Sequence, residues 1–175
     1  MDYELIEKQV LYEGSRIRLE VHHLLADGVR YKKEVVVHPG AVVILPVLDE
    51  QTILLIRNRR YTVGQVLIEL PAGTLEKGED PLNCAGRELL EETGYLAGRL
   101  KLMASFYASP GILTEKMHVF VAYDLEKKQQ ELDLGEQIET LPVTIGEALE
   151  MIRTGEIEDS KTIAALLMFE KFGRP

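Results

Sequence analysis

The sequence contains a single cysteine, Cys84, among 175 residues, which excludes a disulfide within the chain and a zinc site built from several thiolates. Its 4 histidines show no spacing typical of metal ligands. No apolar run is long enough to cross a bilayer. The N-terminus is acidic and lacks the basic start of a signal peptide. We therefore expect a cytoplasmic protein.

The chain also has fewer basic residues than acidic ones, 20 against 29. The formal net charge is −9, which argues against general binding of nucleic acid, because such binding needs clustered lysine and arginine. An anionic substrate would need a divalent cation or local arginines to reverse this field. Hydrophobic residues make up 46% and charged residues 28%, as in ordinary globular proteins, and we find no internal repeat. The length suits one domain with a small appendage.

The first part of the chain reads as an antiparallel flap. Residues 16–25 and 29–38 alternate and are rich in β-branched side chains, and Ala26-Asp27-Gly28 between them favours a hairpin turn. Pro39-Gly40 then breaks the pattern. We therefore assign residues 1–38 to an N-terminal flap and residues 39–175 to the main domain.

The rest of the chain predicts an α+β fold. The apolar runs of the main domain indicate strands, which fall at 41–48, 52–57, 66–70, near 100–107 and 117–125. Thr144 and Glu147 form a capping box for a helix that closes near Gly155, and a last helix starts at Asp159 or Ser160 and stops at Gly173. Strands on either side of one helix, with helices at the end, favour an α/β/α sandwich.

A helix is expected between Pro81 and Gly94. Asp80 suits the N-cap, Pro81 the first helical position, and Gly94 a left-handed stop. At about 100° per residue, one face of this helix is apolar and is formed by Leu82, Ala85, Gly86 and Leu89. Because glycine inside a helix costs about 1 kcal/mol relative to alanine, Gly86 indicates that another segment passes close by.

An acidic arc lies beside this apolar face. Glu88, Glu91 and Glu92 share about 100° of the helix surface, and carboxylate oxygens are ligands that suit Mg²⁺ or Mn²⁺. The plain alternative is a solvated acidic face, which is the usual meaning of a glutamate run. Arg87 can reach Glu91 one turn later and can also hold Glu79 in the preceding loop. That packing favours a metal site.

The spacing across this region resembles the signature of the Nudix hydrolases. All seven fixed positions are filled, by Gly73, Glu79, Arg87, Glu88, Glu91, Glu92 and Gly94, while Tyr95 stands where an aliphatic residue is usual. The resemblance implies a mixed β-sheet between helices, with the signature as a loop–helix–loop. It also implies Mg²⁺-dependent cleavage of a nucleoside diphosphate linked to another group, with Mn²⁺ as a possible substitute.

Other segments are similar to the ADP-ribose pyrophosphatases within this family. They are the Pro110-Gly111 turn in residues 105–115, the stretch 37–42 and the approach to the signature at 69–73. The resemblance thus covers most of residues 33–139. It implies hydrolysis of ADP-ribose to AMP and ribose 5-phosphate.

The resemblance also assigns roles to residues. It implies that the metals are held by Glu88, Glu91, Glu92 and the backbone oxygen of Ala72, and we count Glu92, Arg87 and Glu79 among the catalytic residues. A loop glutamate supplies the general base, for which we choose Glu136, with Glu139 second. Candidate substrate contacts are Arg57 for phosphate or purine, Glu115 for the terminal ribose, Pro110 as a substrate marker, and Glu34, which in relatives reaches the nucleotide across a dimer. The plain alternatives are exposed arginine, turn-stabilising glutamate, an ordinary proline turn and solvated loop glutamates.

Some positions depart from the subfamily and keep other substrates open. Residues 57–61 stand where Arg-Gln-Tyr-Arg is common, and Lys33 replaces an arginine whose bidentate contacts lysine cannot make. GDP-mannose or another nucleoside diphosphate sugar is therefore the nearest alternative. A ligand-sensing, non-enzymatic Nudix-like protein is another, against which the intact glutamates argue, and capped RNA fits poorly with the acidic charge. Ile17, Leu19 and Val21 alternate on one side of a flap strand, and we expect a homodimer.

Overall fold

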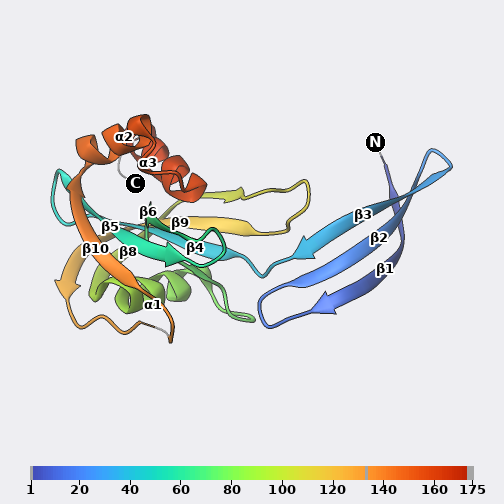
Figure 1. The fold of residues 1–175 in the computed structure, drawn as a ribbon, viewed down its shortest axis with the longest axis horizontal. Coiled ribbons are helices and arrows are strands. Elements are labelled where there is room, and N and C mark those ends of the chain that lie inside the picture. Colours follow the sequence, from blue (N-terminus) through green and yellow to red (C-terminus); the bar gives the residue numbers. More distant parts are fainter. Residues whose placement is uncertain (1, 133, 173–175) are drawn as a thin grey trace.

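The computed structural model describes residues 2–132 and 134–172. The strands are β1 (Glu4–Glu13), β2 (Arg18–Ala26), β3 (Val29–Val37), β4 (Ala41–Pro46), β5 (Thr52–Arg60), β6 (Gln65–Glu69), β7 (Ala72–Thr74), β8 (Tyr95–Tyr107), β9 (Lys116–Lys127) and β10 (Ile138–Thr144). The helices are α1 (Pro81–Thr93), α2 (Ile145–Thr154) and α3 (Ser160–Phe172). Figure 1 shows sheets between helices, with α1 on one face and α2 and α3 on the other.

The body is an α/β/α sandwich, so the predicted fold class is confirmed. One sheet has the order β7-β4-β9-β8 and the other the order β10-β5-β6. β4 pairs in parallel with β9 and antiparallel with β7, so the larger sheet is mixed. All six residues of β4 are buried, which explains its unbroken apolar sequence, since helices cover both of its faces. Val42 and Ile44 pack toward α1, whereas Val43 and Leu45 pack toward α2 and α3.

The helix ends follow the predicted caps. The Asp80 side chain accepts a hydrogen bond from Leu82 N, Pro81 begins α1, and Gly94 ends it in a left-handed conformation with φ of 70°. Thr144 and Glu147 form the predicted capping box of α2. α3 starts at Ser160, while its expected stop at Gly173 lies outside the described residues.

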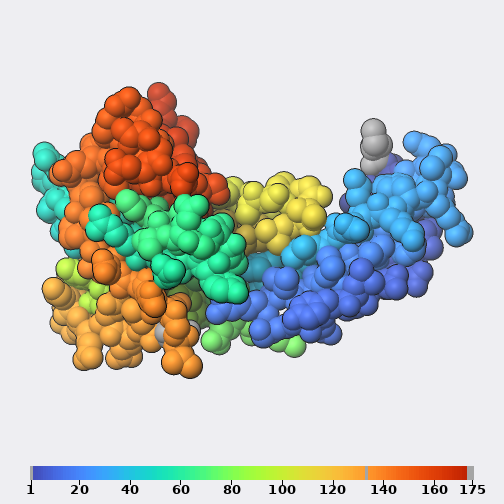
Figure 2. All heavy atoms as spheres, viewed as in Figure 1, coloured from blue at the N-terminus to red at the C-terminus, as the bar shows by residue number. Residues whose placement is uncertain are grey.

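The flap is a three-stranded antiparallel sheet with the order β1-β2-β3. The predicted hairpin is its β2–β3 part, and the turn has positive φ at Asp27 and Gly28, as a tight hairpin requires. The sheet projects away from the body, so that β1 is exposed along its whole length (Figures 1 and 2). Within it, Glu20 is buried and bonds Arg18 at 2.5 Å and His22 at 2.6 Å, and these bonds, led by that to His22, lower the pKa of Glu20.

Several strands differ from the sequence prediction. β1, β7 and β10 were not predicted, and β8 begins directly after Gly94 instead of near residue 100. β1 shows no alternation because its pairing with β2 has two register shifts, each of which lets neighbouring apolar residues change face. The prediction of the apolar face of α1 was also partly wrong. Leu82 is 46% exposed, and the buried Cys84 takes its place beside Ala85 and Leu89.

Candidate active site

A cavity of about 690 Å³ lies where the flap meets the body. Its walls come from distant parts of the chain, including the β1–β2 connection, the end of β3, the strand β7 with the following loop, and α1. The acidic side chains of the body that line it are Glu76, Glu88, Glu92 and Glu136, and the arginines are Arg16, Arg18, Arg60 and Arg87. Carboxylates and guanidinium groups thus share one hollow, which suits an anion accompanied by a cation.

Glycine at position 73 lets a helix carboxylate reach the floor of this cavity. A Cβ atom built on Gly73 would lie 1.8 Å from the carboxyl carbon of Glu88 and 2.0 and 2.3 Å from its oxygens. No side chain longer than hydrogen fits there while Glu88 keeps its position. Burial raises the pKa of Glu88, because the ionised form loses water that its contact with Arg87 only partly replaces. A bound divalent cation would replace it, so the donor set fits Mg²⁺ or Mn²⁺.

Glu92 is the most buried carboxylate of the site. It is 3% exposed, and one of its oxygens accepts a hydrogen bond from Ala72 N at 2.8 Å, which ties α1 to β7. Burial, with the nearby charges of Glu88 and Glu136, raises the pKa of Glu92 to about 8. Such a group is costly to keep ionised unless a positive charge joins it. Ala72, whose backbone oxygen is a predicted metal ligand, also lines the cavity.

Arg87 holds the acidic residues around it in place. Its Nε and Nη2 atoms donate to the two oxygens of Glu79 at 3.1 and 3.2 Å, and its Nη1 donates to Glu91 at 2.9 Å. The same Nη1 lies 2.8 Å from an oxygen of Glu88. The hydrogen bond from Arg87 is the largest influence on Glu79 and lowers its pKa. The sequence prediction that Arg87 reaches both Glu79 and Glu91 is therefore confirmed.

The three helix glutamates do not yet converge on one point. Among the described residues, no group of three or more histidine, cysteine, aspartate or glutamate side chains is gathered closely enough to hold an ion. The contacts above explain this, because Arg87 occupies oxygens of both Glu88 and Glu91. A cation held by all three would have to compete with Arg87 for these oxygens.

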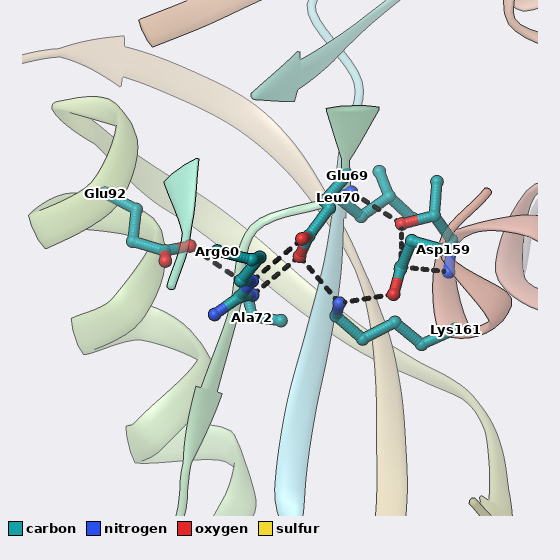
Figure 3. A network of polar contacts seen from close by, with 8 residues as sticks. Arg60, Glu69, Leu70, Ala72, Glu92, Asp159 and Lys161 are labelled. Carbon is teal, nitrogen blue, oxygen red and sulfur yellow. Dashed lines mark hydrogen bonds and ion pairs between the residues drawn. The ribbon is translucent and has the colours of Figure 1, made fainter. Parts of the chain in front are cut away.

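A buried ionic network supports the wall opposite α1 (Figure 3). Arg60 donates to both oxygens of Glu69 at 2.8 and 2.6 Å, and Lys161 donates to Glu69 at 2.7 Å. Asp159 accepts from Lys161 at 2.8 Å and from Thr162. Glu69 is 1% exposed, and these cations lower its pKa against the opposing effect of its burial. The network fixes Arg60, which lines the cavity, and joins α3 to the strand that leads into the signature.

The remaining predicted residues fall into two groups. Glu136 lines the cavity close enough to Glu88 and Glu92 to raise their pKa values. Glu139 is exposed on β10, where it is the register partner of the exposed Arg57 on β5, and neither residue lines the cavity. Glu34 is exposed on β3, outside the cavity wall.

The loop with Pro110 and Glu115 lies against the base of the flap. Ile112 O accepts from Val36 N at 2.8 Å, and Thr114 N donates to Val36 O at 3.0 Å. Glu115 Oε1 lies 3.5 Å from Nδ1 of His38, which lines the cavity, while Pro110 is exposed. Neither Pro110 nor Glu115 is in the cavity wall itself.

Sequence reasoning identified Arg87 but missed the other arginines of the wall, Arg16, Arg18 and Arg60. It chose Arg57, whereas Arg60 lines the cavity, because three residues along a strand move a side chain to the opposite face. The burial pattern of β5, in which Arg57 and Arg59 are exposed, follows this alternation. Arg16 and Arg18 reach the cavity from the flap through tertiary packing, for which the sequence carries no local signal.

Comparison with known proteins places the chain in a family. It matches the NUDIX domain over residues 37–166. It is 40% identical over 169 residues to the ADP-ribose pyrophosphatase of Bacillus subtilis (strain 168), with 95% of this chain and 91% of that protein covered. It is 38% identical over 164 residues to the methanol dehydrogenase activator of Bacillus methanolicus, with 92% and 89% covered. The GDP-mannose pyrophosphatase of Citrobacter koseri is 38% identical over 177 residues, with 93% and 92% covered.

A solved structure agrees in fold. The crystal structure of an ADP compounds hydrolase superposes with a TM-score of 0.86, covering 98% of this chain and 94% of that one at 22% sequence identity. The chain belongs to the NUDIX family, and it is a pyrophosphohydrolase of the Nudix type. No helix among residues 2–132 and 134–172 is long and apolar enough to cross a membrane.

Proposed function

We propose that this enzyme hydrolyses the diphosphate bond of ADP-ribose, or of a related ADP-sugar, to AMP and ribose 5-phosphate, with Mg²⁺ as cofactor and Mn²⁺ able to replace it. The observation that carries the proposal is one cavity lined both by Glu88, Glu92 and Glu136 and by four arginines. The relatedness to an ADP-ribose pyrophosphatase at 40% identity supports the choice of substrate.

The metal ions would be held by Glu88, Glu91, Glu92 and the carbonyl oxygen of Ala72. They would neutralise the diphosphate and make the attacking water more acidic. Gly73 leaves room for the carboxylate of Glu88, and the hydrogen bond from Ala72 N orients Glu92. Arg87, braced by Glu79, sets the positions of Glu88 and Glu91.

Glu136 is the proposed general base, with Glu139 as second choice. It takes a proton from water as the water oxygen bonds to one phosphorus atom, and the bond from that phosphorus to the bridging oxygen breaks. The electron pair leaves with the second phosphate. Arg60 and Arg16 line the same cavity and supply positive charge to the phosphates, while Arg57, Glu34, Pro110 and Glu115 remain candidate substrate contacts outside its wall.

Glu34, at a position that in relatives reaches the nucleotide across a dimer, would contact the substrate of the partner subunit. We propose a cytoplasmic homodimer in which residues 1–38 form the dimerisation flap and residues 39–175 the hydrolase domain. Support comes from apolar side chains of the flap that are 40% exposed or more, namely Tyr3, Leu5, Ile6, Val10, Leu11, Tyr12, Ile17 and Val29. Sedimentation equilibrium of the full chain would test this.

GDP-mannose is the second candidate substrate. Lys33 replaces an arginine of the ADP-ribose enzymes, and a GDP-mannose pyrophosphatase is 38% identical to this chain. The deciding experiment measures release of AMP or GMP from ADP-ribose, ADP-glucose and GDP-mannose at equal concentration with Mg²⁺. We expect the highest kcat/KM with ADP-ribose. A higher kcat/KM with GDP-mannose would make GDP-mannose the favoured substrate and ADP-ribose the alternative.

The control for chemistry is Glu92→Gln, which keeps the size of the side chain and its acceptor for Ala72 N. We expect kcat to fall on the order of 10²-fold or more, because a ligand of the metal is lost. Equal turnover by the variant and the wild type would remove the assigned chemistry and favour a ligand-sensing protein.

A further inference from the structure

The segment that follows β9 is fastened to the end of the helix that carries the site glutamates. We call residues 128–131 the anchor segment. Lys128 N donates to the carbonyl oxygen of Gly94 at 2.6 Å, and Glu131 N donates to that of Glu91 at 3.0 Å. The last carbonyls of a helix have no partner within the helix, so the anchor segment satisfies groups that would otherwise need water.

Gln130 extends this attachment to β10. Its Nε2 atom donates to the carbonyl oxygen of Glu92 at 2.6 Å and lies 3.4 Å from the carbonyl oxygen of Ile138, the first residue of β10. A side-chain amide nitrogen carries two hydrogens and can serve both acceptors. Gly94 permits the approach, since a Cβ there would lie 2.9 Å from Gln130 N. One side chain therefore joins the end of α1 to the start of β10.

The connection that Gln130 closes is the one that contains Glu136. Glu136 lies two residues before Ile138 and lines the cavity beside Glu88 and Glu92. A general base must stay within hydrogen-bond reach of the attacking water, and an error of about 1 Å in such a position can cost on the order of 10²-fold in rate. When the two ends of a connection are held together, the residues between them can sample less space.

We propose that Gln130 is a positioning residue, which holds the Glu136 connection in register with α1 through the carbonyls of Glu92 and Ile138. The inference rests on the proposed function for the role of Glu136 as base. The attachment itself is independent of that role.

The test compares Gln130→Met with Gln129→Met. Methionine keeps the length of the side chain and removes the donor, and Gln129 is the exposed neighbour. With ADP-ribose and Mg²⁺ we expect kcat to fall about tenfold in Gln130→Met, with KM and Mn²⁺ affinity within about twofold, and no change in Gln129→Met. A change in Mn²⁺ affinity as large as that in kcat would overturn the proposal, because it would mean that α1 itself had moved.

A double-mutant cycle separates positioning from general damage. In a Glu136→Gln background, Gln130→Met should lower kcat no further, because the group it positions is already gone. A tenfold loss in both backgrounds would refute the role. Gln130→Glu, which keeps the size and lacks the donor, repeats the test if the methionine variant folds poorly.

A second readout needs no substrate. Amide hydrogen exchange of peptides spanning residues 134–140 should be about fivefold faster or more in Gln130→Met than in Gln129→Met, while peptides from β4 stay unchanged. Equal exchange in both variants would refute the attachment even in an active enzyme. Faster exchange in a protein that hydrolyses no nucleotide sugar would instead leave the attachment standing and reject the proposed function.

Discussion

The two sides of the cavity are built in different ways. On the body side, α1 packs against β7, and its Glu92 is 3% exposed with Ala72 N bonded to it. On the flap side, Arg16 is exposed and stands on a connection of a sheet that projects from the body (Figure 1). The buried side holds a carboxylate that is costly to keep ionised without a cation, whereas the exposed side offers charge that water already solvates. We therefore expect the body to determine chemistry and stability, and the flap to determine affinity.

The largest expected effect, on the body side, is the pH dependence of the free energy of unfolding of the metal-free protein. Because the pKa of folded Glu92 is raised to about 8, the unfolded chain loses its proton first, and stability falls as pH rises from about 4.5 through 8. Glu92→Gln removes this cost, so in EDTA it should be more stable than the wild type at pH 8, on the order of 3 kcal/mol, and close to it at pH 5. Urea unfolding at both pH values measures this. A stability difference independent of pH would contradict it.

Gly73→Ala should disturb the body side of the cavity without disturbing the packing of the sheets and helices. The new methyl group would meet the carboxylate of Glu88, which is the far end of a flexible side chain and can move away. We expect a small change in the free energy of unfolding but a fall in kcat on the order of 10²-fold, since Glu88 leaves the site. Steady-state kinetics and urea unfolding of the variant and the wild type test this prediction. Unchanged kcat would mean that Glu88 does not act in the position seen here.

Arg16→Ala tests the flap side. If Arg16 contacts only the bound anion, its loss should raise KM about tenfold, the value of one charge-assisted hydrogen bond, and leave kcat and the unfolding midpoint unchanged. Arg30→Ala, an exposed arginine on β3 outside this cavity, is the matched control. A fall in kcat with unchanged KM would place Arg16 in the chemistry and remove the contrast between the two sides.

The same contrast explains what the sequence could predict. The loop–helix–loop with Asp80, Pro81 and Gly94 was predictable because caps and glycine stops act within a few residues. Arg16 and Arg60 were not, because they come to line one cavity only after β5 and the flap have packed. β1 escaped prediction because its register shifts remove the alternation by which a strand is recognised.

Gly86→Ala is the smallest effect and corrects an interpretation of the sequence. The sequence predicts a close approach at Gly86, yet a Cβ there would meet only Leu100, at the ordinary contact distance of 3.7 Å, while the close approach lies at Gly73. Alanine favours the helix by about 1 kcal/mol, so the variant should be more stable by up to that amount, with kcat and KM unchanged. Urea unfolding and steady-state kinetics, run beside Gly73→Ala, give the comparison. Destabilisation by Gly86→Ala would show that α1 packs more tightly there than 3.7 Å allows.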